Sequence, residues 1–193
     1  MTSFDNFRFL DPEAADLARE LVEASEQQRS VFSSFANVWM AFNGWMECVT
    51  QAETDAAMIG ELAEHAKLVT AYEALLDDDP EFKEHILSLI SLLPVLNVRD
   101  VRKKLGRDAF RKFNRIELMS EVQRATVKQQ PVGWTNGAML TWSQLLRTIY
   151  LVRCNLFHGS KSAENFRDHK LVVACDKILR RFISCAECFE WHD

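Results

Sequence analysis

Arg153 and His158, with Asn155 between them and Lys161 just after, lie in the stretch YLVRCNLFHGSK at residues 150–161. Histidine exchanges a proton near neutral pH, so His158 is suited to act as a general base or acid. Arginine stays charged and its planar fork matches phosphate oxygens, so Arg153 is suited to stabilise a phosphate under attack. Lys161 is a candidate phosphate contact, although an exposed loop lysine commonly serves solubility alone. Together these residue types indicate phosphate chemistry that requires no metal.

The spacing of Arg153 and His158 limits how their side chains can meet. On a continuous α-helix, positions five apart diverge by about 140°. Either the helix ends at Phe157, with Gly159 allowing the chain to turn, or a second subunit completes the site. The alternative to a site is a plain helix end, since basic side chains in a last turn interact favourably with the helix dipole.

Helical spacing of apolar residues recurs along the chain, whereas no segment alternates over a full strand length. Residues 94–132 show weak periodicity and are expected to hold one or two short helices, with a short strand pair as the open alternative. The pattern predicts an all-α fold, an antiparallel helical bundle in a single domain of residues 1–193, with a basic, partly irregular insertion at 94–132. Helices are expected at residues 11–50, 55–76, 80–92, from a start between 135 and 141 to 157, and at 163–190, the last capped by Ser162.

Charge is unevenly distributed in this chain, whose formal net charge is −5. Residues 1–96 contain 5 Lys and Arg against 18 Asp and Glu, whereas residues 97–193 contain 18 against 10. The densest basic stretch is residues 99–115. A polyanion such as RNA is therefore expected to bind the second half of the chain.

Within the basic stretch, Arg102, Lys103 and Lys104 are the candidate phosphate contacts, and its phenylalanines are candidates for base stacking. Two alternatives stay open. The stretch can be a solvated helix face, or it can pair with acidic residues of the first half or of a partner. In the first alternative the buried side is formed by Val101, Leu105, Phe110 and Phe113.

The composition, with 48% hydrophobic and 26% charged residues, is that of a globular protein rather than a disordered one. The N-terminal segment is acidic and has no apolar core, and no run approaches the ~18 apolar residues of a membrane span. We therefore expect a cytoplasmic protein with no membrane partner.

Five cysteines without an export signal predict reduced thiols rather than disulfides. Cys175 and Cys185 fall on one apolar helical stripe and are expected to fill the core. Cys185, Cys188 and His192 have a spacing that zinc accepts, but a structural zinc site usually has four ligands. No metal or cofactor is therefore expected, with a small zinc module as the minor alternative.

The segment RCNLFHGSK resembles the Arg-x(4–6)-His signature of the HEPN superfamily, in the R-N-x-L-x-H-G-x-K form of one branch. The match extends to its place before a long final helix and to the aromatic segment FSSFANVWMAFNGW at residues 32–45. One departure is Cys154, where family members carry a polar residue, and Asn155 follows one position later.

This resemblance implies a helical homodimer that cleaves RNA without a metal, commonly as a toxin or an effector of defence against phage. Arg153 would stabilise the phosphate, His158 would transfer protons and Asn155 would orient the substrate or the histidine. An antitoxin or regulatory protein is a further implied partner. The alternative is a catalytically inactive HEPN domain that acts as a dimeric interaction or sensor module.

Overall fold

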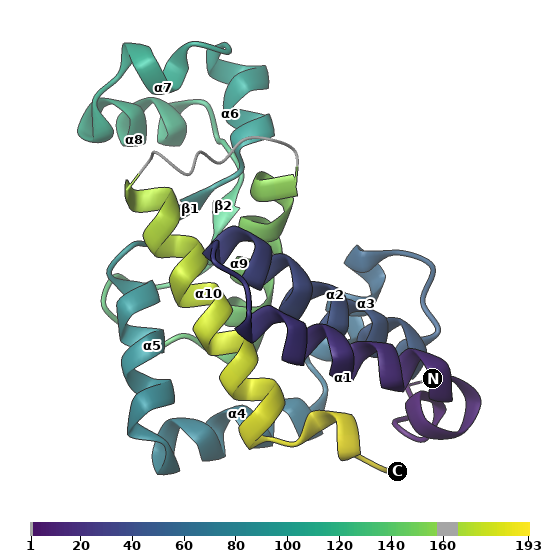
Figure 1. The fold of residues 1–193 in the computed structure, drawn as a ribbon. Coiled ribbons are helices and arrows are strands. Elements are labelled where there is room, and N and C mark those ends of the chain that lie inside the picture. The colour runs from purple at the N-terminus through teal and green to yellow at the C-terminus, as the bar shows by residue number, and fades with distance from the viewer. Residues whose placement is uncertain (1, 158–165) are drawn as a thin grey trace.

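The protein folds into α-helices joined by short connections, as the computed structural model in Figure 1 shows. The structure describes residues 2–157 and 166–193. In these ranges the strands β1 (Val95–Leu96) and β2 (Gln129–Gln130) form one antiparallel pair. The all-α prediction is confirmed. The helices are η1 (Asn6–Leu10, a π-helix), α1 (Pro12–Glu26), α2 (Val31–Thr50), α3 (Asp55–Ala63), α4 (Ala66–Asp78), α5 (Pro80–Ile90), α6 (Val98–Leu105), α7 (Ala109–Lys112), α8 (Arg115–Arg124), α9 (Trp142–Phe157), α10 (Phe166–Cys185) and η2 (Cys188–Glu190, a 3₁₀ turn).

The helix predicted at residues 11–50 is wrong in one respect, because it is two helices, α1 and α2. The segment EQQRS at residues 26–30 offers no apolar side chain to the core. Ser30 is extended, with φ −102° and ψ 126°, so the chain reverses there. α1 consequently packs along α2, which the single-helix prediction did not allow.

The helix predicted at residues 55–76 is also divided, into α3 and α4. His65 separates them, and its Nδ1 accepts the backbone N–H of Lys67 at 3.3 Å. The next helix, α5, begins at Pro80 as predicted, because Asp79 accepts the N–H groups of Glu81 and Phe82 at 3.1 Å each. These breaks arrange α3, α4 and α5 around α9 and α10.

The main core lies where α2, α9 and α10 meet. The rings of Trp142 and Phe182 stack there with centroids 4.5 Å apart, and Phe42 packs edge-on against Phe182. A buried polar network crosses the same region, with Ser34 donating to Asp176 at 2.8 Å and Arg180 donating to Ser34 at 2.8 Å. The core therefore holds α9 rigidly from its first residue.

The final helix ends earlier than predicted. α10 stops at Cys185 instead of residue 190, and the chain continues as the turn η2. Cys175 is buried as predicted, whereas Cys185, the last residue of α10, is exposed. The five cysteines are thiols rather than disulfides, as expected. The predicted cap Ser162 lies outside the described residues.

Residues 94–132 form a helical subdomain of three short helices and the strand pair, where the sequence predicted one or two short helices in a basic, partly irregular insertion. α6, α7 and α8 lie together at one end of the molecule (Figure 1). They surround a small core of their own, formed by Leu96, Val101, Ala109, Leu118, Val122 and Val127. The short strand pair left open by the sequence is present, and it packs against α9.

None of the helices in the described ranges is long and apolar enough to cross a membrane.

Candidate functional site

Arg153 lies in the last turns of α9 and points toward α2 and α3. Its Nη1 is 3.1 Å from Oδ2 of Asp55, the first residue of α3. Its guanidinium carbon lies 5.7 Å from the ring centroid of Trp39 and 4.9 Å from that of Phe157. The side chain keeps 25% of its surface exposed. Arg153 is therefore fixed by a carboxylate and two rings but remains reachable from solvent.

One polar atom of this arginine is not satisfied by the residues that the structure describes. The Nε of Arg153 is buried and has no hydrogen-bond partner there. Asp55 approaches the guanidinium at Nη1. The guanidinium therefore has donors in reserve for an anion.

Asn155 faces the opposite side of the helix and is 96% buried. Its Nδ2 donates to the carbonyl of Leu96 at 2.9 Å, and its Oδ1 accepts the backbone N–H of Val98 at 3.1 Å. Both ends of the amide are thus bound to the chain between β1 and α6. Asn155 joins the helical subdomain to α9, and this contact makes it a positioning residue.

His158 and Lys161 lie outside the described residues. Cys154 is half-buried and lies one turn after Tyr150, whose titration it influences. Burial, followed by the neighbouring Cys154, raises the pKa of Tyr150 to about 12. The phenol is therefore protonated at neutral pH and is available as a hydrogen-bond donor.

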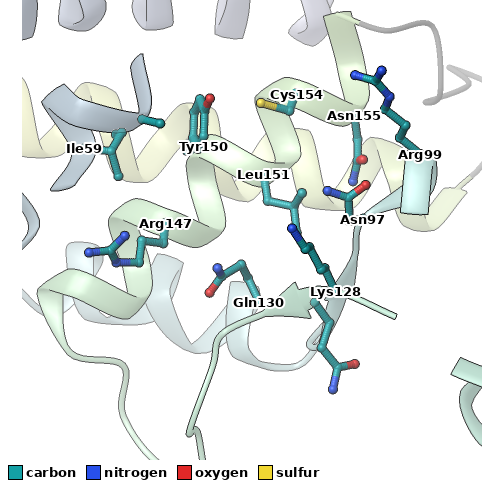
Figure 2. Close-up of a pocket in the computed structure, with 12 residues that line it drawn as sticks. Ile59, Asn97, Arg99, Lys128, Gln130, Arg147, Tyr150, Leu151, Cys154 and Asn155 are labelled. Atoms are coloured by element: carbon teal, nitrogen blue, oxygen red, sulfur yellow. The ribbon is translucent and has the colours of Figure 1, made fainter. Parts of the chain in front are cut away.

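A pocket of about 380 Å³ opens between α3, α9 and the subdomain (Figure 2). Three cations line it: Arg99 of α6, Lys128 just before β2, and Arg147 of α9. Of the lining residues that the structure describes, none carries a negative charge. The other lining residues are Ala56, Ile59, Asn97, Gln129, Gln130, Tyr150, Leu151, Cys154 and Asn155. The pocket thus combines positive charge, amides and an apolar wall, which suits a phosphate-bearing ligand.

The cations that the sequence singled out do not line this pocket. Arg102 and Lys103 are exposed on α6. Lys104 pairs with Asp100 at 3.2 Å and donates to the carbonyl of Thr126 at 2.8 Å, so it stabilises the subdomain. Asp100 and Lys104 both belong to the basic stretch. Their ion pair is therefore not the pairing with acidic residues of the first half that the sequence left open.

The stretch 99–115 matches the solvated-face alternative in part. Val101 is fully buried, and Leu105 and Phe113 pack partly buried against the small core. Phe110 is 43% exposed. Of Phe110 and Phe113, only the Phe110 ring is therefore exposed enough to stack on a base.

Sequence reasoning missed Arg99, Lys128 and Arg147 as site residues. A signal existed for Arg147, because it shares a helix face with Tyr150, Leu151 and Cys154 at spacings of three, four and seven. Arg99 and Lys128 come from other elements and meet this face through the docking of the subdomain.

The three C-terminal residues with zinc-like spacing do not come together. Cys185 is exposed, Cys188 is buried beneath the C-terminal turn, and His192 lies 3.5 Å from Asp5. Burial raises the pKa of the Cys188 thiol far above its ordinary value, which disfavours the thiolate that zinc binds. Within the described ranges, no three His, Cys, Asp or Glu side chains are grouped to hold a metal. The zinc-module alternative therefore lacks a site here.

Comparison of the chain with protein-family models, curated protein sequences and solved structures gives no match. The HEPN resemblance accordingly stays a prediction from the motif of residues 153–161.

Proposed function

We propose that this protein is a metal-independent endoribonuclease of the HEPN type. The observation that carries the proposal is the pocket beside the motif. A chain with net charge −5 gathers Arg99, Lys128 and Arg147 around one pocket without a carboxylate among its described lining residues. Such local positive charge attracts a phosphate backbone against the overall charge of the protein.

In the proposed reaction the substrate supplies the nucleophile. The 2′-oxygen of a ribose bonds to the adjacent phosphorus, and the bond from phosphorus to the 5′-oxygen breaks. His158 takes the 2′-hydroxyl proton or gives a proton to the leaving 5′-oxygen. The products are a 2′,3′-cyclic phosphate and a 5′-hydroxyl, so no water or metal is consumed in this step.

Arg153 stabilises the negative charge that develops on the phosphorane. Its pairing with Asp55 holds the guanidinium in place before substrate arrives, and the exposed quarter of the side chain is offered to phosphate. Asn155 contributes by fixing the subdomain that carries Arg99. Lys161, Arg102 and Lys103 contact phosphates further along the strand.

The biological setting is part of the same proposal. The active form is a homodimer, because Arg153 and His158 diverge on a continuous helix and a second subunit can complete the site. The protein acts in the cytoplasm as a toxin or phage-defence effector, held in check by an antitoxin or regulatory protein.

The test is RNA cleavage in EDTA by the purified protein, compared with its His158→Ala and Arg153→Ala variants. The parent cleaves, and both variants lose at least about a hundredfold in rate. Equal cleavage by parent and His158→Ala would reject the mechanism.

A second candidate is a catalytically inactive dimeric interaction or sensor module. It is favoured by the structural contacts of the motif residues, since Arg153 pairs with Asp55 and Asn155 binds backbone groups. In that case the Arg153→Ala variant melts at lower temperature, and neither parent nor variant cleaves RNA. Melting curves beside the cleavage assay therefore separate the two functions.

A further inference from the structure

We infer that the pocket between α3, α9 and the subdomain binds one nucleotide of single-stranded RNA and selects its base. This inference rests on the proposed function and adds to it a specificity-determining site. Figure 2 shows Arg147, Tyr150, Leu151, Cys154 and Asn155 along one side of the pocket.

The cations are placed at two ends of the pocket. Arg147 lies two turns before Asn155 on α9, about 12 Å along the helix axis. Arg99 follows Val98, whose backbone N–H is bound to Asn155, so it lies at the other end. Lys128 joins Arg99 there, because its carbonyl accepts the N–H of Asn97 at 2.9 Å. Phosphates on both sides of one nucleotide can therefore be contacted.

These cations are not neutralised by ion pairs within the described residues. Arg99 and Lys128 are exposed, and Arg147 makes a 3.3 Å contact to the hydroxyl of Ser143 through Nε. Asp100 lies close to Lys128, whose backbone N–H it accepts at 2.7 Å, but its carboxylate is paired with Lys104. The positive charge of the pocket is thus left for an external anion.

The middle of the pocket suits a base. Leu151 and Ile59 provide an apolar wall, and Tyr150 adds an aromatic ring. Gln129 and Gln130 add amides of the kind that read base edges. The Oε1 of Gln129 is buried and has no hydrogen-bond partner in the part of the chain that the structure describes. A donor on a base edge, either an amino group or the N3–H of uracil, would satisfy this oxygen once the Gln129 side chain turns toward the bound base.

Arg153 does not line the pocket, but it shares a neighbour with Tyr150, which does. Tyr150 stacks on Trp39, with centroids 6.1 Å apart and an angle of 28° between the rings. The guanidinium of Arg153 lies over the same indole. A strand held in the pocket therefore passes beside the proposed catalytic arginine, which makes the bound nucleotide a neighbour of the cleaved bond.

The experiment measures the binding of fluorescein-labelled 12-nucleotide RNAs by anisotropy, at several salt concentrations and in EDTA. All proteins carry His158→Ala so that the probe is not cut. The pocket variants are Arg99→Gln, Lys128→Gln and Arg147→Gln, and the matched controls are Lys83→Gln on α5 and Arg29→Gln between α1 and α2. Both controls remove one exposed positive charge that does not line the pocket.

Each pocket variant is expected to weaken binding at least threefold and to lower the slope of log K against log salt by about 0.7, the value for one lost contact on a single strand. The controls are expected to leave both quantities unchanged. Gln129→Leu is expected to change the relative affinities for A-, C-, G- and U-rich probes, without a change in salt slope. Melting curves verify that each variant is folded.

The outcomes test the pocket assignment and the ribonuclease proposal separately. If the parent cuts RNA and the pocket variants bind RNA as well as the His158→Ala protein does, the pocket assignment is overturned and the ribonuclease proposal stands on the cleavage itself. If the parent cuts no RNA but the pocket variants lose binding, the pocket assignment stands and the catalytic proposal falls. If no RNA is bound or cut, both fall.

Discussion

Replacing Asn155 by alanine is expected to loosen the subdomain from α9. The wild-type amide makes two buried hydrogen bonds, 2.9 Å to the carbonyl of Leu96 and 3.1 Å from the N–H of Val98. Alanine cannot replace either bond, and it leaves the two backbone groups inside a region where water is excluded. The change therefore removes favourable contacts and creates buried unsatisfied groups together.

The magnitude follows from those contacts. Two net hydrogen bonds contribute about 1 kcal/mol each, and an unsatisfied buried group costs about 1–3 kcal/mol. Partial relaxation of the chain near Val98 limits the total, so we expect the free energy of unfolding to fall by about 2–4 kcal/mol. Asn155→Asp is expected to destabilise similarly at neutral pH, because a carboxylate cannot donate to the Leu96 carbonyl.

Urea unfolding gives the free energy, and hydrogen exchange read by mass spectrometry locates the change. Amides of residues 96–130 should exchange faster in Asn155→Ala, while those of α2 and α10 should not. The matched control is Asn43→Ala, since the Asn43 amide makes one weak 3.6 Å contact to the sulfur of Met58. A loss below 0.5 kcal/mol in Asn155→Ala, with unchanged exchange, would refute the positioning role of Asn155.

Three further outcomes are expected. Hydrogen bonding to Arg181 lowers the pKa of Asp79 in the folded protein. The Asp79 carboxylate therefore stabilises the fold at pH values above its unfolded pKa of about 3.9. That stability is lost as the pH falls through the lower, folded pKa. The gap in unfolding free energy between parent and Asp79→Asn, which keeps a cap residue, should therefore close in acid; a gap independent of pH contradicts this. Arg153→Lys and Asp55→Asn should each lower the free energy of unfolding by about 1–2 kcal/mol, and a double-mutant cycle should give a coupling energy on the order of 1 kcal/mol. Additive effects of the two substitutions would contradict the ion pair. Of the five free thiols, exposed Cys185 should react first with Ellman's reagent and the three buried ones only after unfolding; rapid labelling of more than two thiols in the native protein would contradict the fold.

The long helices were predictable because their apolar residues repeat at helical spacing over several turns. The turns inside the predicted helices were not, since EQQRS at 26–30 and Glu64–His65 contain neither glycine nor proline. Polar residues of these types are compatible with a helix, and tertiary packing decides that the chain reverses there.

The folding of residues 94–132 around a core of their own could not be predicted, for another reason. Its helices are 4 to 10 residues long, too short for periodicity to stand out. Its small core joins Leu96 to Val127, residues 31 positions apart, so burial there depends on contacts that a local pattern does not reveal. The positive charge of this segment could therefore be predicted, but its packing around a core of its own could not.

Spacing and residue type predicted Arg153 and Asn155 as site residues, and this stays a prediction until the cleavage test. They did not indicate what each side chain touches. Asp55 pairs with Arg153 across 98 positions of the sequence, and Asn155 binds backbone groups more than fifty positions away. Such partners follow from the packing of α3 and the subdomain on α9, which no local motif encodes.

The most direct test of the central claim is the chemistry of the RNA ends. Cellular RNA is incubated with the purified protein in EDTA, beside the His158→Ala variant, and the fragment ends are determined. Our account predicts 2′,3′-cyclic phosphates and 5′-hydroxyls with the parent alone. Ends carrying 5′-phosphates, or no cutting by a folded dimer, would contradict it.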